Sequence, residues 1–233
     1  MVDDALDYLR ERLQAAVFVP YPWDGEDENL RAFRSKEELI AWYCQPPGDV
    51  GQPYRDRGFY TRELAYLSKL VRPRLVVEFG TSLGIGVCLL HWLNPGARLV
   101  TVDTAAETFL PGDQRVQIGH MALYQDIPCE YVTMNSWDYV TRDAGLCFID
   151  ADHSHEAVLK DSERAWRNRN PDRWAIAWHD HNDRHPGEVE AVGSFCTRVD
   201  VELQWLPDSD TVWIEGHIPH CLKSSAWREE LYS

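Results

Sequence analysis

The chain is poor in positive charge and in long apolar runs. Its 233 residues include 23 Lys and Arg against 38 Asp and Glu, for a formal net charge of -15. No basic stripe can neutralise a nucleic-acid backbone, so we expect no nucleic-acid partner. No window approaches the roughly 18 apolar residues of a membrane span, and the acidic start lacks the features of a signal peptide. We expect a soluble, cytoplasmic protein that does not bind membranes.

Closely spaced cysteines and internal repeats are also absent. Several of the six cysteines lie in apolar runs, and none forms a CxxC pair; they are Cys44, Cys88, Cys129, Cys147, Cys196 and Cys221. Scattered cysteines of this kind are typical of buried, reduced thiols rather than of metal or redox motifs. The length is sufficient for one α/β domain with a full hydrophobic core.

From residue 60 onward, β-rich apolar runs alternate with amphipathic helical patterns. Helices are predicted over 61–71, 86–93, 155–168 and 188–199, and strands over 74–79, 98–103, 129–134, 145–150 and 173–180. This alternation predicts an α/β fold with a Rossmann-like, doubly wound sheet. Two β-rich runs within 199–217 predict a hairpin that adds an antiparallel strand. Residues 1–59, rich in Pro, Gly and aromatics, are predicted to form a cap of short helices and loops over a domain of residues 60–233.

The first predicted strand of the sheet ends in the glycine-rich sequence EFGTSLGIG. Gly80 and Gly84 allow a tight turn and a close backbone approach, although the spacing differs from GxGxxG. Glu78 stands just before the turn. Asp103 ends the next strand, where a carboxylate can accept hydrogen bonds from ribose hydroxyls. The combination predicts a ligand that contains a nucleoside.

Two later strands end in carboxylates. Asp150 and Asp180 would meet at one rim of the sheet, where their hard oxygen ligands suit Mg²⁺ or Mn²⁺. His153 follows closely, and a neutral imidazole there can accept a proton near neutral pH. Other polar residues nearby are interpreted structurally: Asp152 or Ser154 as a helix cap, Glu156 and Asp161 as helix N-terminal acids, His179 as pointing back into the sheet, and His185 as a surface residue.

Together these motifs resemble a known family. VVEFGTSLGIG, LVTVD, FIDADHSHE and AIAWHDHND with PGEVEAV are similar to the class I S-adenosylmethionine-dependent methyltransferases. They most resemble the macrocin-type and cephalosporin-hydroxylase-like small-molecule O-methyltransferases, over roughly residues 60 to 215. The resemblance implies a seven-stranded sheet with an antiparallel last strand. It also implies methyl transfer from S-adenosyl-L-methionine to a hydroxyl of a sugar or natural-product intermediate. Homo-oligomerisation is compatible with the sequence, which does not decide it.

The resemblance implies roles for single residues. The methionine part of the cofactor would be surrounded by Glu78, Gly80, Thr81, Ser82 and Gly84, the ribose held by Asp103, and the adenine contacted by Ser136 and Trp137. The metal ligands would be Asp150, Asp180 and His181, and the catalytic base His153. Relatives commonly carry Asp or Asn in place of His181, so a nitrogen ligand leaves room for manganese, iron or zinc beside magnesium. Trp137 is equally compatible with a structural role.

Two alternatives stay open. DADHSH and HDH could ligate one or two metals that activate water in a metal-dependent hydrolase. That hypothesis leaves the glycine turn and Asp103 unexplained, and the order of ligands is not HxHxDH. A non-catalytic, methyltransferase-like binding protein is the other alternative, since a fold does not imply a function. The joint presence of a glycine turn, a ribose carboxylate, two metal carboxylates and a base argues against an inert scaffold.

Overall fold

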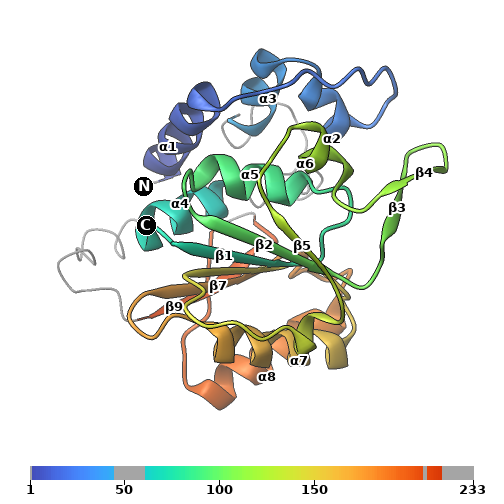
Figure 1. The fold of residues 1–233 in the computed structure, drawn as a ribbon. Helices are drawn as coiled ribbons and strands as arrows, with labels where there is room; N and C mark the ends of the chain where they lie inside the picture. Colours follow the sequence, from blue (N-terminus) through green and yellow to red (C-terminus); the bar gives the residue numbers. More distant parts are fainter. Residues whose placement is uncertain (1, 45–60, 207–208, 217–233) are drawn as a thin grey trace.

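Seven strands form a central sheet with helices on both faces (Figure 1). The computed structural model describes residues 2–44, 61–206 and 209–216. The strands are β1 (Leu75–Phe79), β2 (Arg98–Asp103), β5 (Glu130–Thr133), β6 (Leu146–Ile149), β7 (Trp174–Trp178), β8 (Gln204–Trp205) and β9 (Val212–Gly216). Their order is β5-β2-β1-β6-β7-β9-β8. The first five are parallel, and β9 is antiparallel to both neighbours. The predicted Rossmann-like sheet with an antiparallel last strand is confirmed.

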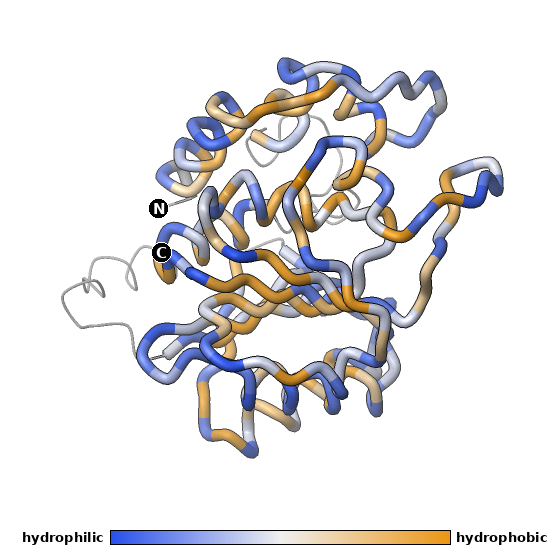
Figure 2. Tube along the Cα trace, viewed as in Figure 1, coloured by the Kyte–Doolittle hydropathy of each residue, from blue (hydrophilic) through white to orange (hydrophobic). Residues whose placement is uncertain are grey.

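Alternation along the strands divides their side chains between two hydrophobic clusters. The helices that cover the two faces are α4 (Thr61–Val71) and α5 (Ile85–Leu93) on one side, and α7 (His155–Asn168) and α8 (Pro186–Val199) on the other. In β1, Val76 packs in the cluster of α4 and α5, whereas Val77 packs in the cluster of α7 and α8. Successive strand residues point to opposite faces, so an almost uninterrupted apolar strand serves both clusters. Figure 2 shows these apolar strands at the centre of the molecule.

The first 44 residues pack on the side of α4 and α5 (Figure 1). They form α1 (Val2–Ala15), α2 (Glu28–Arg31), η1 (Ala32–Arg34) and α3 (Lys36–Tyr43). Leu9, Leu13 and Phe33 are fully buried in the same cluster as Trp92 of α5. The N-terminal segment therefore shares the hydrophobic core of the sheet. The predicted boundary between residues 59 and 60 lies outside the described residues.

The segment between β2 and β5 was not assigned from the sequence. It forms β3 (Glu107–Leu110) and β4 (Gln114–Gln117), a separate antiparallel hairpin that extends from the body in Figure 1, and then α6 (His120–Tyr124). The backbone N–H groups of Gly119 and Met121 donate to the carbonyl groups of Ser82 and Leu83, each at 2.8 Å. This segment therefore braces the glycine-rich loop that follows β1.

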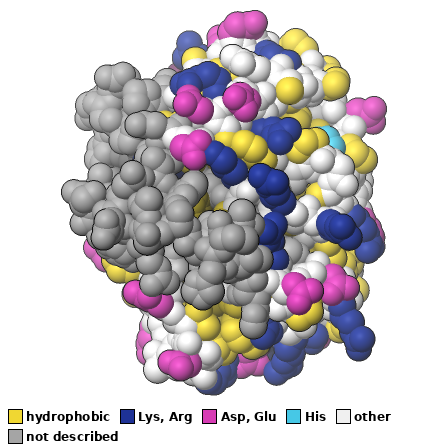
Figure 3. Space-filling view, turned by 90° about the vertical axis from the view of Figure 1, so that its left-hand side faces the viewer, with side chains coloured by type: hydrophobic (Ala, Val, Ile, Leu, Met, Phe, Trp, Pro, Cys, Tyr) yellow, Lys and Arg dark blue, Asp and Glu magenta, His cyan; other side chains and the backbone are white. Residues whose placement is uncertain are grey.

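Positive charge gathers locally in spite of the acidic composition. A cleft of about 640 Å³ beside the amino ends of β1 and β2 is lined by Arg12, Lys69, Arg72 and Arg74. On the face drawn in Figure 3, Lys and Arg side chains form a band with Asp and Glu side chains around it. The net charge thus does not describe every part of the surface. No helix in the described part of the chain is long and apolar enough to cross a membrane.

The cysteines follow the expectation where the structure describes them. Cys44, Cys88, Cys147 and Cys196 are buried with free thiols, while Cys129 is half-buried and also free. Burial raises the pKa of Cys44 and of Cys196 to about 11, which keeps these thiols protonated near neutral pH. Cys221 lies outside the described residues.

Candidate active site

The carboxyl ends of β1, β6 and β7 meet along one rim of the sheet. The backbone N–H groups of Gly80, Asp150 and His179 each donate to the neighbouring strand, with N···O distances of 2.9, 2.8 and 3.0 Å. The parallel ladder therefore continues one residue past each strand. Ligands of open α/β sheets bind outside this rim, so these residues lie where a site is expected.

Close backbone packing accounts for two of the predicted glycines. Gly80 has φ of +92°, and a Cβ atom there would lie 1.9 Å from the carbonyl oxygen of Asp150. Gly84 has φ of +82° and forms the N-cap of α5, where a Cβ atom would lie 2.9 Å from Cα of Gly119. Both positions require glycine, because a side chain would be strained and would collide with backbone atoms. The loop is thus fixed between β6 and the segment before α6.

Asp103 shapes the glycine-rich loop through its carboxylate. Its Oδ2 accepts the N–H groups of Thr81 at 2.9 Å and Ser82 at 3.2 Å, and its Oδ1 accepts the N–H group of Ala105 at 2.9 Å. A carboxylate offers about four acceptor sites. Asp103 therefore keeps the capacity to accept one further donor, such as a ribose hydroxyl, while it holds the loop.

A cleft of about 370 Å³ opens at this rim. Six of the predicted site residues line it: Gly80, Ser82, Asp103, Ser136, Trp137 and Asp150. Val102, Met134 and Ala151 add apolar contacts. Trp137 is half-buried, and Nζ of Lys160 lies 5.0 Å from the centroid of its ring. These six residues lie at or after the ends of four strands, β1, β2, β5 and β6.

Other predicted cofactor residues lie behind the cleft. The Glu78 side chain is 2% exposed, and its Oε2 accepts the hydroxyl of Thr101 at 2.6 Å. The hydroxyl oxygens of Thr81 and Thr101 are also 2.6 Å apart, so a short hydrogen-bonded chain ends on Glu78. Burial raises the pKa of Glu78 well above its ordinary value. The predicted contacts of Glu78, Thr81 and Gly84 with the cofactor stay predictions.

The cap aromatics do not line this cleft where they are described. Because loops and caps often carry specificity on rigid scaffolds, the sequence predicts that Tyr21, Trp23, Trp42, Tyr43 and Tyr54 of the cap shape the choice of acceptor. The residues that line the cleft include none of the first four. Tyr21 and Tyr43 are buried; the Tyr21 hydroxyl lies 3.1 Å from Nε2 of His120. Tyr54 lies outside the described residues. A contribution of the cap to acceptor choice stays a prediction.

Asp161 belongs to the cleft, although its sequence position suggested a helix N-terminal role. It lies on α7, is 1% exposed, and accepts the Ser136 hydroxyl on Oδ1 at 2.5 Å. Its Oδ2 is buried and has no hydrogen-bond partner among the described residues. Burial raises the pKa of Asp161 to about 6. A partly desolvated acid therefore stands beside the residues predicted to contact adenine.

The raised pKa of Asp161 predicts a pH-dependent stability of the ligand-free protein. The folded state binds this proton more tightly than the unfolded state, so the free energy of unfolding falls as pH rises from about 4 to about 6 and stays lower above it. Asp161→Asn should remove this loss and exceed the wild type by about 3 kcal/mol at about pH 8. Urea unfolding at about pH 5 and about pH 8 measures the difference, with the exposed Asp138→Asn as control. An unchanged pH dependence in Asp161→Asn would contradict the prediction.

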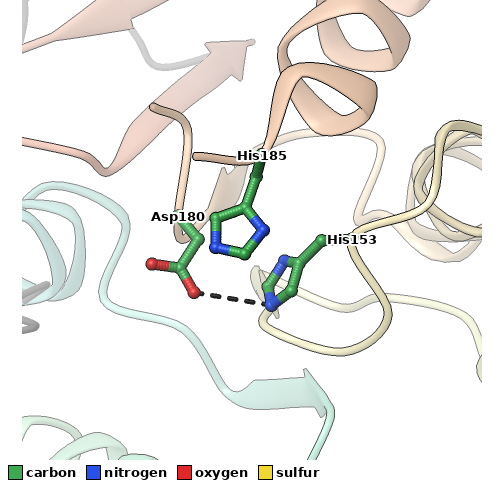
Figure 4. A group of neighbouring side chains, drawn as sticks. All are labelled: His153, Asp180 and His185. Carbon is green, nitrogen blue, oxygen red and sulfur yellow. Dashed lines mark ion pairs between the residues drawn. The ribbon is translucent and has the colours of Figure 1, made fainter. Parts of the chain in front are cut away.

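Two groups of candidate metal ligands share Asp180. One comprises Asp150, His179 and Asp180, and the other His153, Asp180 and His185; within each group the ligand atoms lie within 4.8 Å of one another. Figure 4 shows that in the second group the side chains converge from the loop after β6 and from the segment between β7 and α8. Carboxylate oxygens with imidazole nitrogens fit divalent cations such as Mn²⁺, Fe²⁺ or Zn²⁺, and a carboxylate pair also fits Mg²⁺.

His179 faces the carboxylates, where the sequence analysis expected it to point into the sheet. Its Nδ1 lies 3.2 Å from Oδ1 of Asp150 and 3.5 Å from Oδ2 of Asp180, and its Nε2 lies 3.7 Å from Oδ1 of Asp210. The ring is 8% exposed. Although burial opposes the charge, Asp150 and Asp180 raise the pKa of His179 well above its ordinary value. The two carboxylates therefore favour the imidazolium form of His179 in the ligand-free protein.

His181 belongs to neither group. Asp180 has φ of +60°, and the backbone N–H of His181 donates to the carbonyl of Asp210 at 2.7 Å, so the chain turns after Asp180. Nδ1 of His181 is buried without a hydrogen-bond partner among the described residues, and burial lowers its pKa. The geometry favours His179 over His181 beside Asp150 and Asp180, and the ligand role of His181 stays a prediction.

His153 contacts three side chains. Its Nδ1 lies 2.9 Å from Oε2 of Glu188, its Nε2 lies 3.4 Å from Oδ2 of Asp180, and its ring centroid is 4.2 Å from that of His185. The hydrogen bond to Glu188 raises the pKa of His153, with smaller contributions from Asp180 and Asp150. His153 was predicted from the sequence, whereas Glu188 and His185 were not. Glu188 ends the sequence PGE and His185 precedes it; Pro and Glu at these positions are ordinary signals of a helix start.

Comparison with known proteins identifies the fold. No protein-family model and no curated protein sequence matches the chain. Among solved structures, the O-methyltransferase NovP is 11% identical with a TM-score of 0.54, over 92% of this chain and 97% of that one. An O-methyltransferase from Bacillus cereus in complex with S-adenosylhomocysteine is 15% identical with a TM-score of 0.52, over 92% and 99%.

A third similar structure is that of an enzyme of calicheamicin biosynthesis. CalS11, a TDP-rhamnose 3'-O-methyltransferase of calicheamicin biosynthesis, is 16% identical with a TM-score of 0.51, over 91% of this chain and 93% of that one. The chain therefore has the fold of the small-molecule O-methyltransferases over nearly its whole length. These solved structures confirm the predicted fold.

Proposed function

We propose that the protein is an S-adenosylmethionine-dependent O-methyltransferase that acts on a hydroxyl group of a small molecule. The observation that carries this proposal is a single rim that combines three features of the described residues: the loop at Gly80, the carboxylate of Asp103 beside the cleft, and the Asp and His side chains around Asp180. In this proposal, a half that binds the nucleoside and a half that handles the proton would lie next to each other on this fold.

The cleft is proposed to hold the cofactor. Backbone groups near Gly80 and Ser82 would contact the methionine part, Asp103 would accept a ribose hydroxyl, and Ser136 and Trp137 would contact the adenine ring. Glu78 and Thr81 would act from behind by fixing the loop, because they are buried and joined through Thr101. Gly84 forms the N-cap of α5, the helix that follows the glycine-rich loop.

The carboxylates Asp150 and Asp180 are proposed to hold a divalent metal. Their ligand atoms and that of His179 lie within 4.8 Å of one another, which fits a small cation. Such a cation would lower the pKa of the acceptor hydroxyl and orient it. His179 would lose its proton when a cation replaces the charge that it supplies in the ligand-free protein. Magnesium fits the two carboxylates, and manganese fits the carboxylates together with an imidazole.

His153 is proposed to be the general base. Hydrogen bonding of Nδ1 to Glu188 leaves Nε2 to accept a proton from the acceptor hydroxyl as its oxygen attacks the methyl group. The sulfonium brings its own leaving group, so the remaining task of the protein is to align the two reactants. A sugar or natural-product hydroxyl is the proposed acceptor, in line with the structural similarity to CalS11, a TDP-rhamnose 3'-O-methyltransferase.

Calorimetric titration tests the proposal. The metal-stripped protein is titrated with S-adenosylhomocysteine, and again after addition of Mg²⁺ and of Mn²⁺. Micromolar binding supports the cofactor assignment, and a metal-dependent change supports the site at Asp150 and Asp180. Methyl transfer is then assayed on TDP-rhamnose and on catechols. Absence of binding under all conditions would reject the methyltransferase function and leave the Asp and His groups to be tested as a hydrolytic centre.

Asp103→Asn is predicted to weaken binding of S-adenosylhomocysteine by about 10- to 100-fold. The carboxylate accepts three backbone N–H groups, and hydrogen bonds to a charged group contribute about 1.5–3 kcal/mol each. An amide offers one acceptor oxygen where the carboxylate offers two, so the loop loses its shape and the ribose its acceptor. Titration measures the dissociation constant, with the exposed Asp138→Asn as control. Equal affinities for Asp103→Asn and wild type would reject this role.

A further inference from the structure

The ring of His153 is fixed by residues that are distant in sequence. Glu188 and His185 both come from the start of α8, thirty or more residues later, and Asp180 comes from the end of β7. Figure 4 shows the rings of His153 and His185 beside each other, with Asp180 on the Nε2 side of His153. One edge of the imidazole is therefore directed at Glu188 and the other at the rim.

Glu188 is an unusual residue for this place because its carboxyl group is buried, which raises its pKa, while the hydrogen bond with His153 opposes this rise. The side chain is 2% exposed, and its Oε2 lies 2.9 Å from Nδ1 of His153. Burying a carboxylate is costly unless it is paired or hydrogen-bonded. The first turn of α8 lowers this cost, since the free N–H groups of a helix N-terminus favour negative charge. Glu188 thus directs a buried, acceptor-only group at one atom of His153.

Gly187 permits this close approach. A Cβ atom at position 187 would lie 3.0 Å from the backbone nitrogen of His155 and 3.2 Å from the carbonyl oxygen of His153. The start of α8 therefore packs directly on the backbone that carries His153. Pro186 precedes it at the helix N-terminus and fixes the direction of entry. Backbone packing and the hydrogen bond together specify the position of the ring.

Of the two carboxylates that face His153, Glu188 lies 2.9 Å from Nδ1 at hydrogen-bond geometry, whereas Asp180 lies 3.4 Å from Nε2. An ionised carboxylate can only accept a hydrogen bond, so Nδ1 of His153 carries the proton of the contact with Glu188. In the neutral ring, Nε2 then holds the lone pair. We propose that Glu188 is a positioning residue that selects the Nδ1–H form of His153 and thereby presents the Nε2 lone pair to the rim. The catalytic consequence rests on the proposed methyltransferase function, whereas the selected form of the ring follows from the geometry alone.

Imidazole NMR tests the positioning role without any assay of activity. Long-range ¹H–¹⁵N correlation identifies the protonated nitrogen of neutral His153, with His153→Ala used for assignment. The wild type should show Nδ1–H, and Glu188→Leu should shift His153 toward Nε2–H. Glu188→Gln, which preserves the side-chain shape, should also lower the Nδ1–H fraction, because an amide can donate as well as accept. Glu190→Leu, on the exposed side of α8, is the matched control and should leave the spectrum unchanged.

Kinetics then test whether Glu188 acts through His153. Glu188→Leu should lower kcat about 100-fold or more, with the KM for S-adenosylmethionine within about 3-fold of wild type. In a His153→Ala background the same substitution should have little further effect, because residues that act as a unit are non-additive. An additive loss in the double variant would overturn the positioning role.

The outcomes separate this proposal from the proposed function. If the wild-type protein neither binds S-adenosylhomocysteine nor transfers methyl groups, the proposed function is wrong. The NMR experiment still decides the role of Glu188 in that case. An unchanged Nδ1–H form in a folded Glu188→Leu variant rejects the positioning role, whatever the activity. If Glu188→Leu does not fold, the comparison of Glu188→Gln with wild type and Glu190→Leu decides in the same way.

Discussion

Asp180→Asn is expected to lower kcat for methyl transfer by about 1000-fold or more, with the affinity for S-adenosylhomocysteine within about 3-fold of wild type. Asp180 belongs to both groups of candidate ligands and also faces Nε2 of His153 at 3.4 Å. Loss of its charge would remove a metal ligand and the partner of the base at once, and about 4 kcal/mol of transition-state stabilisation corresponds to this factor. The cofactor cleft is lined by other residues, so binding should persist.

Asparagine is the informative replacement because of the backbone. Asp180 has φ of +60°, a conformation that Asn tolerates better than most residues. Asp200, the C-cap residue of α8 with φ of +56°, provides the matched control at the opposite end of the helix from His185. Asp200→Asn should retain full activity and metal dependence. Activity of Asp180→Asn close to wild type would reject the metal site and the base geometry together.

Gly80→Ala is expected to cause the largest loss of stability and to abolish micromolar binding of S-adenosylhomocysteine. A Cβ atom would meet the carbonyl oxygen of Asp150 at 1.9 Å, and φ of +92° strains any side chain. Left-handed strain costs about 1–2 kcal/mol, and overpacking against backbone adds about 1–3 kcal/mol. The melting temperature should fall by roughly 10 °C, and the displaced loop should no longer match the cofactor.

Gly96→Ala separates backbone strain from steric collision as causes of the loss of stability. Gly96 has φ of +87°, but a Cβ atom there meets nothing within 4 Å. It therefore reports the backbone strain without the collision, and its melting temperature should fall by only about 2–4 °C. Binding should stay unchanged in this control. Equal losses in both variants would show that contact between Gly80 and Asp150 does not hold the rim together.

The sequence by itself determined the sheet and the residues at its strand ends. Apolar runs such as Leu75–Phe79 and Trp174–Trp178 are long enough for strands, and their alternation with amphipathic helices leaves few other topologies. Since parallel strands end at one rim, the meeting of Gly80, Asp103 and Asp150 at one cleft could be predicted without coordinates. The hairpin of β3 and β4 was not predicted from the sequence, because its short strands carry no clear apolar alternation.

The tertiary structure decided which histidines surround the carboxylates. Strand alternation predicts that His179 points away from Asp180, but this rule fails where the chain leaves the strand and Asp180 adopts a left-handed conformation. Glu188 and His185 carry only ordinary signals of a helix start in the sequence. Their contact with His153 arises because α8 packs on the loop after β6 at Gly187, a tertiary contact between segments that are distant along the chain.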